Sequence, residues 1–274
     1  MSLGGKAVLV TGASSGIGSE IVRLLAGRGD RIIISARRTD RLEALAAELR
    51  LKGATIHVAP ADLADPDSSR ALSQVVQEQF GALDVLINNA GYGLSTLYTD
   101  ADPETIRRQV EVNLLSPLLL THALLPLLLK SRGTIINVGS SIAVAAIPAF
   151  GVYGMTKAAL AYWNDTLRRE LRTRGVNVCL VEPGPVATEF FDIVGGNSEE
   201  KLPYWLKRPP AWLTAKADDA ARRIVNLIDH PKRRISMLRR AVWPFRAAGA
   251  VIRLFPWLGD VLMSPHVVET KESR

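Results

Sequence analysis

Continuous apolar runs rich in β-branched residues alternate with helical patterns over the first two-thirds of the chain. Such runs are typical of parallel strands that are covered on both faces, whereas half-exposed strands alternate between apolar and polar residues. The pattern predicts strands at residues 7–10, 31–35, 55–58, 85–88, 134–138 and 177–181.

The segments between these runs show helical spacing. In residues 40–52, Leu42, Leu45, Ala46 and Leu49 recur at positions i, i+3, i+4 and i+7, and Asp40 is the expected N-cap. Repeated strand–helix units imply right-handed crossovers. We therefore expect an α/β fold with a doubly wound, Rossmann-type parallel sheet and helices on both faces. Ligands of such sheets bind beyond the carboxyl ends of the strands.

The pattern changes after Pro183-Gly184. Residues 185–215 are rich in proline, glycine and aromatic side chains, and are expected to cover a substrate. A helix at 217–228, a strand at 234–237 and a basic, apolar tail at 238–274 follow. No repeat or linker is visible in the 274 residues, so we expect one domain over 1–274.

A glycine-rich loop follows the first predicted strand and leads into a helix. It reads Thr11-Gly12-Ala13-Ser14-Ser15-Gly16-Ile17-Gly18, with the spacing G-x-x-x-G-x-G. Glycines permit a sharp turn and a close approach of backbone to a pyrophosphate, and a helix N-terminus favours anions. A tight structural turn could also explain the cluster, but the strand–loop–helix context favours dinucleotide binding.

The end of the second strand predicts which dinucleotide binds. An acidic residue there would accept hydrogen bonds from the ribose of NAD, but this chain reads Ser35-Ala36-Arg37-Arg38. Guanidinium groups suit the 2′-phosphate of NADP. We favour NADP(H) over NAD(H), although both arginines could instead begin a solvated helix face.

Tyr153 and Lys157 stand four residues apart at the start of a helix expected over 153–172, so they share one face. The pKa of an unperturbed tyrosine is about 10, and a nearby ammonium group stabilises the phenolate. The Y-x-x-x-K spacing often arises by chance. Its meaning depends on the motifs around it.

The motifs Thr11 to Gly18, Asn88-Asn89-Ala90-Gly91, Asn113, Ser140, Tyr153-x-x-x-Lys157 and Pro183-Gly184 occur in this order. Over about residues 6–190 the chain thereby resembles the single-domain branch of the short-chain dehydrogenase/reductase family. The resemblance implies that Ser140 binds the substrate oxygen and that Tyr153 donates or accepts its proton. It implies that Lys157 lowers the pKa of the tyrosine and binds the nicotinamide ribose, and that Asn113 holds a water.

The resemblance also implies a cofactor site. In it, the 88–91 turn forms the floor, Asp62 meets the adenine, and Val186 and Thr188 approach the carboxamide. The expected members are Gly12, Ser14, Ser15, Gly16, Ile17, Gly18, Arg37, Arg38, Asp62, Leu63, Asn89, Ala90, Gly91, Tyr153, Lys157, Pro183, Gly184, Val186 and Thr188.

Three of these residues have open alternatives. Ser141 could replace Ser140, because the two serines are adjacent. Asn113 could merely satisfy buried backbone groups, and Asp62 could be a helix N-cap ahead of Pro66.

The composition limits other functions. The net charge is +7, with much of the excess near the C-terminus, but no nucleic-acid-binding module is visible. The four histidines are isolated, so no metal site is expected; His57 and His122 are expected in core or interface positions. One cysteine, Cys179, and the lack of a secretory signal favour the cytoplasm. The apolar stretch 114–129 is short and contains Pro117 and Pro126, so it fits a buried helix better than a membrane span.

The segment after residue 185 suggests a hydrophobic alcohol or ketone as substrate, with Gly195-Gly196 as a flexible point. Helices over 103–129 and 153–172 resemble the pair that builds dimers in the family, so a homodimer or homotetramer is expected. The tail could be a membrane-surface anchor, which is not favoured, a subunit arm or a cap. The expected apolar wall is Phe190, Phe191, Ile193, Val194, Tyr204, Trp205 and Trp212.

The sequence therefore predicts an NADP(H)-dependent oxidoreductase with Tyr153 as general acid and base. An epimerase or dehydratase using the same Tyr/Lys pair, and a non-catalytic dinucleotide-binding scaffold, are the alternatives.

Overall fold

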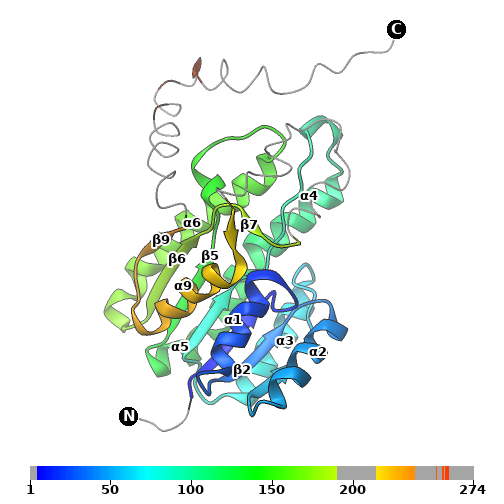
Figure 1. Cartoon of the computed structure of the whole chain (residues 1–274). Coiled ribbons are helices and arrows are strands. Elements are labelled where there is room, and N and C mark those ends of the chain that lie inside the picture. The colour runs from blue at the N-terminus through cyan, green and yellow to red at the C-terminus, as the bar shows by residue number, and fades with distance from the viewer. Residues whose placement is uncertain (1–4, 190–213, 238–250, 252–254, 256, 259–274) are drawn as a thin grey trace.

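The computed structural model describes residues 5–189 and 214–237, together with 251, 255, 257 and 258. Seven parallel strands form one sheet in the order β3-β2-β1-β4-β5-β6-β9. Figure 1 shows helices on both sides of this sheet, with α1 and α9 in front. The predicted doubly wound α/β fold is confirmed. The division into one domain stays a prediction.

The strands lie within one residue of the predicted runs. They are β1 (Ala7–Thr11), β2 (Arg31–Ser35), β3 (Thr55–Val58), β4 (Val85–Asn88), β5 (Thr134–Val138), β6 (Asn177–Glu182) and β9 (Arg234–Ser236). A second, two-stranded sheet pairs β7 (Val186–Ala187) with β8 (Ala215–Lys216).

Alternate residues of each strand enter two separate cores. Val8 and Val10 of β1 pack with α1 (Gly16–Ala26), α2 (Thr39–Arg50) and α9 (Ala217–Asp229). Ala7 and Leu9 pack on the opposite face with α3 (Pro66–Gln79), α5 (Ser116–Ser131) and α6 (Gly151–Leu171). Because both faces of the inner strands are covered, these strands are buried and mostly apolar, as the sequence predicted.

The N-terminus of α2 differs from the prediction. The helix begins at Thr39 and its N-cap is Arg38, so the expected N-cap Asp40 lies in the first turn instead. An acidic side chain in that turn still complements the helix dipole. The side chain of Arg38, at the cap position, does not cap the helix; its guanidinium group instead donates to Ser14 and Ser15.

The apolar helix is longer than the predicted stretch. α4 (Pro103–Val110), a π-helical turn (Glu111–Leu115) and α5 run without a break over Pro103–Ser131, and Asp102 caps the start. By length and composition alone this helix could cross a membrane. Leu120, Leu124 and Leu128 on its inner face are buried in the core beneath the sheet, so it serves here as a core helix.

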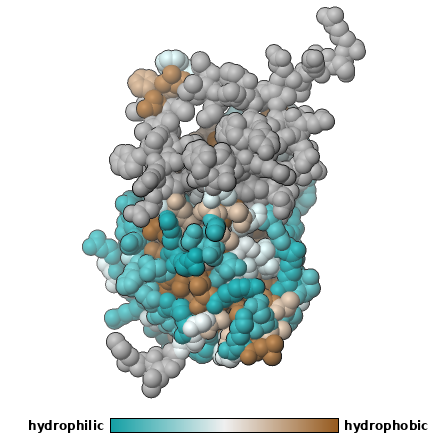
Figure 2. All heavy atoms as spheres, in the orientation of Figure 1, coloured by the Kyte–Doolittle hydropathy of each residue, from teal (hydrophilic) through white to brown (hydrophobic). Residues whose placement is uncertain are grey.

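Hydrophilic side chains cover most of the described surface in Figure 2, with small hydrophobic areas between them. The large exposed hydrophobic side chains on α5 and α6 and the π-helical turn are Leu115, Leu119, Met155 and Tyr162. In the tail, Val251, Phe255 and Trp257 are also exposed.

Candidate active site

The site lies where the chain reverses its direction of winding. β1 and β4 are neighbours in the sheet, but the helix after β1 covers one face and the helix after β4 covers the other. The loops that leave these two strands therefore diverge and open a crevice at the carboxyl ends.

The glycine loop holds backbone segments too close for any side chain. A Cβ atom on Gly18 would lie 2.1 Å from the carbonyl oxygen of Gly12. Gly12 has a φ of +67°, and its Cβ would lie 2.8 Å from Cα of Ala90. Gly16, with a φ of +56°, lies under the side chain of Thr188. This cradle at the start of α1 fits the pyrophosphate of a dinucleotide.

Asn89 and Thr11 lock the second loop onto the first. The Asn89 side chain donates to the carbonyl oxygens of Thr11 and Gly12 at 3.0 and 3.2 Å. The Thr11 hydroxyl accepts from the backbone amides of Asn89 and Ala90, both at 3.1 Å. The predicted cofactor floor is thus fixed by hydrogen bonds before any ligand binds.

The two arginines after β2 point to different neighbours. Arg38 donates to the hydroxyls of Ser14 at 3.1 Å and Ser15 at 2.6 Å. Since the Ser15 side chain makes no capping bond to α1, the first turn of that helix keeps its amides for a ligand. Arg37 is exposed and acts electrostatically on Asp62 and Tyr92.

Asp62 forms an ion pair that the sequence did not reveal. Its carboxylate accepts from Arg108 of α4 at 2.6 Å and from the backbone amide of Ala64 at 3.1 Å. Burial alone would raise the pKa of Asp62, but the Arg108 contact and the Ala64 amide lower it overall. The N-cap of α3 is Asp65, so the N-cap alternative for Asp62 is wrong. Its neighbour Leu63 is buried in the core.

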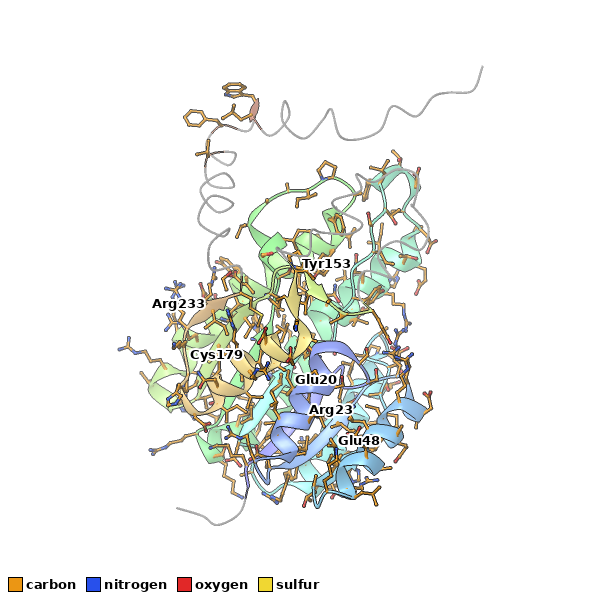
Figure 3. The ribbon with its side chains drawn as sticks, viewed as in Figure 1. Glu20, Arg23, Glu48, Tyr153, Cys179 and Arg233 are labelled. Carbon is orange, nitrogen blue, oxygen red and sulfur yellow. The ribbon has the colours of Figure 1, made fainter. Side chains whose placement is uncertain are left out.

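Ser140, Tyr153 and Lys157 meet above the end of β5. Tyr153 and Lys157 lie one helical turn apart on the inner face of α6, and Tyr153 is hydrogen-bonded to Ser140. Lys157 Nζ lies 5.9 Å from the centre of the Tyr153 ring and donates to the carbonyl oxygen of Val138 at 2.9 Å. Figure 3 shows Tyr153 beyond the upper ends of the strands.

Burial shifts both titratable groups in this cluster. It raises the pKa of the Tyr153 phenol to about 12, against the lowering effect of the Ser140 hydrogen bond. It lowers the pKa of the Lys157 ammonium group to about 8. Desolvation therefore dominates the pKa of Tyr153, which lies above its ordinary value and not, as the resemblance implies, below it.

The adjacent serines have different tasks. The Ser140 side chain faces Tyr153 and also accepts from the backbone amide of Ile142 at 3.3 Å. The backbone amide of Ser141 donates to the carbonyl oxygen of Pro183 at 2.9 Å, which ties the two loops together. This arrangement favours Ser140 over Ser141 as the residue that binds the substrate oxygen.

Asn113 lies in the π-helical turn and uses its side chain structurally. Its amide group donates to the carbonyl oxygen of Tyr92 at 2.8 Å and to Thr156 at 3.3 Å, and its Oδ1 accepts from the Tyr92 amide at 3.0 Å. The alternative role considered for Asn113, in which its side chain satisfies buried backbone groups, agrees with these hydrogen bonds. Gly91 lies beside it, where a Cβ would be 3.2 Å from Lys157 Nζ.

The segment after β6 carries the remaining predicted cofactor residues. Pro183 and Gly184 follow β6 directly, and Val186 and Thr188 continue into β7 and beyond. Thr188 covers Gly16, so this segment approaches the glycine loop. The expected apolar wall from Phe190 to Trp212, and the Gly195-Gly196 point, lie outside the described residues.

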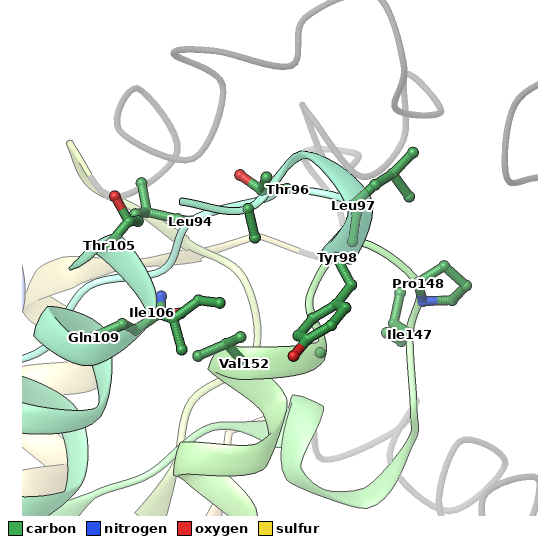
Figure 4. Close-up of a pocket in the computed structure, with 13 residues that line it drawn as sticks. Leu94, Thr96, Leu97, Tyr98, Thr105, Ile106, Gln109, Ile147, Pro148 and Val152 are labelled. Carbon is green, nitrogen blue, oxygen red and sulfur yellow. The ribbon is translucent and has the colours of Figure 1, made fainter. Parts of the chain in front are cut away.

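A cavity of about 310 Å³ lies next to the cluster of Ser140, Tyr153 and Lys157. Its walls come from the loop after β4, from α4 and from residues 147–152, as Figure 4 shows. Val152 precedes Tyr153 in the chain, and Ile147 packs against the cluster of Phe150 and Tyr153. Its lining is mainly apolar: Leu94, Leu97, Tyr98, Ile106, Ile147, Pro148 and Val152, with Thr96, Thr105 and Gln109 as polar members.

The histidine positions require one correction. His57 lies exposed on the outer strand β3 and His122 is exposed on α5, so neither lies in the core, and an interface position stays a prediction for both. Within the described part of the chain, no group of three or more potential metal ligands is present.

Comparisons with known proteins agree with this geometry. Residues 6–196 match the family described as short chain dehydrogenase. The chain belongs to the short-chain dehydrogenase family. Serine 3-dehydrogenase from Agrobacterium fabrum is 35% identical over 227 residues, which cover 82% of this chain and 88% of that protein.

Two solved short-chain dehydrogenases extend the similarity to the whole fold. The one from Sphingobium yanoikuyae, in complex with NADPH, is 27% identical with a TM-score of 0.78, and the match covers 98% of both chains. The one from Burkholderia cenocepacia, in complex with NADP, is 30% identical with a TM-score of 0.75, covering 85% of this chain and 96% of that one.

The sequence did not reveal the partners that organise this short-chain dehydrogenase site across long distances. Arg108 and Glu189 contact site residues that are 46 and 151 positions away, and no local pattern marks either of them. Arg41, one turn after Arg37, has a local signal, since it extends the arginine cluster.

Proposed function

We propose that this chain is an NADP(H)-dependent oxidoreductase that interconverts an alcohol and a carbonyl compound. The observation that carries the proposal is the buried cluster of Ser140, Tyr153 and Lys157 beside a glycine cradle that fits a dinucleotide. When bound, the nicotinamide supplies or accepts the hydride.

The residues of the chain would handle the proton. In the reductive direction, Ser140 orients the carbonyl oxygen, and the protonated phenol of Tyr153 gives its proton to that oxygen as the hydride reaches the carbon. Lys157 holds a positive charge next to the phenolate that remains. Asn113 would keep Tyr92 and Thr156 in place, and holding a water is its further proposed role.

The preference for NADP(H) is supported by charge. Arg37, Arg38, Arg41 and Arg108 gather at the adenosine side of the crevice, and no acidic residue ends β2. Structures of two similar proteins contain NADPH or NADP.

The substrate is proposed to be apolar. The walls of the cavity beside Tyr153 are mainly aliphatic and aromatic, which suits a hydrophobic alcohol or ketone better than a zwitterion. Two relatives carry the name serine 3-dehydrogenase, so serine is the natural competitor in a substrate test.

The partners and compartment are also proposals. Exposed apolar side chains on α5 and α6 support a homodimer or homotetramer built on these helices. The single, unpaired cysteine supports the cytoplasm. Membrane contact through the tail stays a prediction.

The test is NADPH oxidation with a panel of hydrophobic ketones, and NADP reduction with L-serine as the polar contrast. Tyr153→Phe should lower kcat by about 10²–10⁴-fold while NADPH still binds, because only the proton transfer is removed. Equal turnover of Tyr153→Phe and wild type would reject the mechanism, and faster turnover of serine would reject the substrate class.

A further inference from the structure

The carboxylate of Glu189 bridges two arginines near the glycine loop. Its Oε2 lies 2.8 Å from Arg38 Nη1, and its Oε1 lies 2.5 Å from Arg41 Nη1. Arg38 in turn holds the hydroxyls of Ser14 and Ser15. The cluster thus contains one carboxylate, whereas its other members are two guanidinium groups and two hydroxyls, all of which could bind an anionic ligand.

The position of Glu189 follows from the segment that carries it. Thr188, the preceding residue, packs over Gly16, where a Cβ would meet its methyl carbon at 3.0 Å. This contact brings the end of the segment to the start of α1, within reach of the arginines after β2. The hydrogen bonds from Arg38 and Arg41 lower the pKa of Glu189 to about 2, so the carboxylate is charged at neutral pH.

We infer that Glu189 tunes cofactor selectivity by competing with the 2′-phosphate of NADP(H) for Arg38 and Arg41. The inference rests on the proposed function, in which these arginines receive that phosphate. Arginine forks bind carboxylates and phosphates with the same geometry, so one anion can replace the other.

The exchange is feasible because the two ion pairs are weak. The side chains of Arg38, Arg41 and Glu189 are 39%, 44% and 43% exposed, and ion pairs at such exposure contribute little stability. A phosphate brings more negative charge and three acceptor oxygens, and so displaces the carboxylate. NADH has no group to displace it, so Glu189 weakens NADPH binding selectively.

The experiment measures dissociation constants by cofactor fluorescence for wild type, Glu189→Gln and Glu189→Ala. Glu43→Gln is the matched control, because Glu43 lies on α2 and pairs with Arg50 at 3.7 Å, away from the glycine loop. Adenosine 2′,5′-bisphosphate and 5′-AMP, titrated by calorimetry, isolate the effect of the 2′-phosphate. Circular dichroism checks that each variant folds.

Both Glu189 variants should bind NADPH and the bisphosphate about two- to tenfold more tightly, a range set by two exposed ion pairs. Their affinities for NADH and 5′-AMP should stay within about twofold, and Glu43→Gln should match wild type. Unchanged or weaker NADPH binding, or equal gains for NADPH and NADH, would overturn the inference. If wild type binds neither nucleotide, the proposed function fails instead.

Discussion

Tyr153 and Ser140 form a pair in which the geometry distinguishes one serine from its neighbour. The Ser140 side chain is hydrogen-bonded to Tyr153, whereas Ser141 contributes its backbone amide to Pro183. Alanine at position 141 keeps that backbone amide, whereas alanine at position 140 removes the hydroxyl that contacts Tyr153. Comparing the two variants therefore separates the role of the Ser140 side chain from that of the Ser141 main chain.

Ser140→Ala should lower kcat about 10²–10³-fold, as expected when a donor to the reacting oxygen is lost. Ser141→Ala, the matched control, should stay within about threefold of wild type. Steady-state kinetics with saturating NADPH decide between them. A large loss in Ser141→Ala with none in Ser140→Ala would reverse the assignment.

We expect Lys157 to set the alkaline limit of activity. Its pKa is lowered to about 8 by burial, so its ammonium group loses a proton as the pH rises through that value. The Tyr153 pKa of about 12 keeps the phenol protonated over the same range. The proton donor for reduction is therefore present, but the positive charge beside it disappears.

We expect kcat/KM for NADPH in the reductive direction to fall as the pH rises through about 8, since this parameter reports the free enzyme. Lys157→Arg keeps its charge at all accessible pH values. Whatever activity this variant retains should show no fall near pH 8. A fall of equal size in both proteins would assign the titration to another group.

The sequence alone predicted those features of the site that depend on residues close together in the chain. The Tyr153–Lys157 spacing predicts a shared helix face, and the structure places both on the inner face of α6. The raised pKa of Tyr153 could not be predicted, because it depends on burial by side chains from several elements. The Asp62–Arg108 and Glu189–Arg38 contacts also depend on the folded chain.

At the scale of elements, the glycine loop and α1 act as one rigid unit. Gly18 is a buried helical residue, and a Cβ added to it would lie 2.1 Å from the carbonyl oxygen of Gly12, so no other residue fits there. By contrast, Gly154 in α6 has no atom within 4 Å of an added Cβ. The two glycines differ in what surrounds them.

Gly18→Ala should lower the free energy of unfolding by about 1–3 kcal/mol through overpacking and abolish measurable NADPH binding. Gly154→Ala should raise it by about 0.5–1 kcal/mol, because alanine loses less backbone entropy in a helix. Urea unfolding of both variants checks the signs. A stable, NADPH-binding Gly18→Ala protein would contradict the cradle.

The extent of the strands was predictable from the sequence, whereas the N-cap of α2 and the π-helical turn were not. Strands match to within one residue because their apolar runs are interrupted by polar loops. The predicted N-cap of α2 was wrong, because the helix begins at Thr39 with Arg38 as its N-cap. The contacts of Arg38 with Ser14 and Ser15, in a loop about 24 positions earlier, depend on the folded chain. The π-helical turn around Asn113 has no sequence signature that the periodicity could reveal.

At the scale of the whole molecule, the apolar surface of α5 and α6 is larger than one sheet face requires. Leu119 is 52% exposed and Tyr162 is 80% exposed, although both helices otherwise pack into the core. We expect a second copy of the chain to cover this surface.

Leu119→Glu should reduce the mass of the particle in solution to that of a monomer, because a buried unpaired carboxylate is costly. Leu51→Glu is the matched control: Leu51 is 91% exposed at the end of α2, far from this surface in the fold. Light scattering coupled to gel filtration measures both. A monomeric wild type, or a Leu119→Glu oligomer, would contradict the expectation.

The single thiol of the chain offers a probe of the whole fold. Cys179 lies in β6 between β5 and β9, is 1% exposed, and burial raises its pKa to about 11. Only an exposed thiolate reacts with alkylating reagents, so the folded protein should be inert to them. The rate of alkylation then reports how often the sheet opens at β6, next to the edge strand β9. Alkylation of Cys179 can therefore report the opening of the folded chain without any engineered label. A bound dinucleotide should slow this alkylation, because it stabilises the folded state.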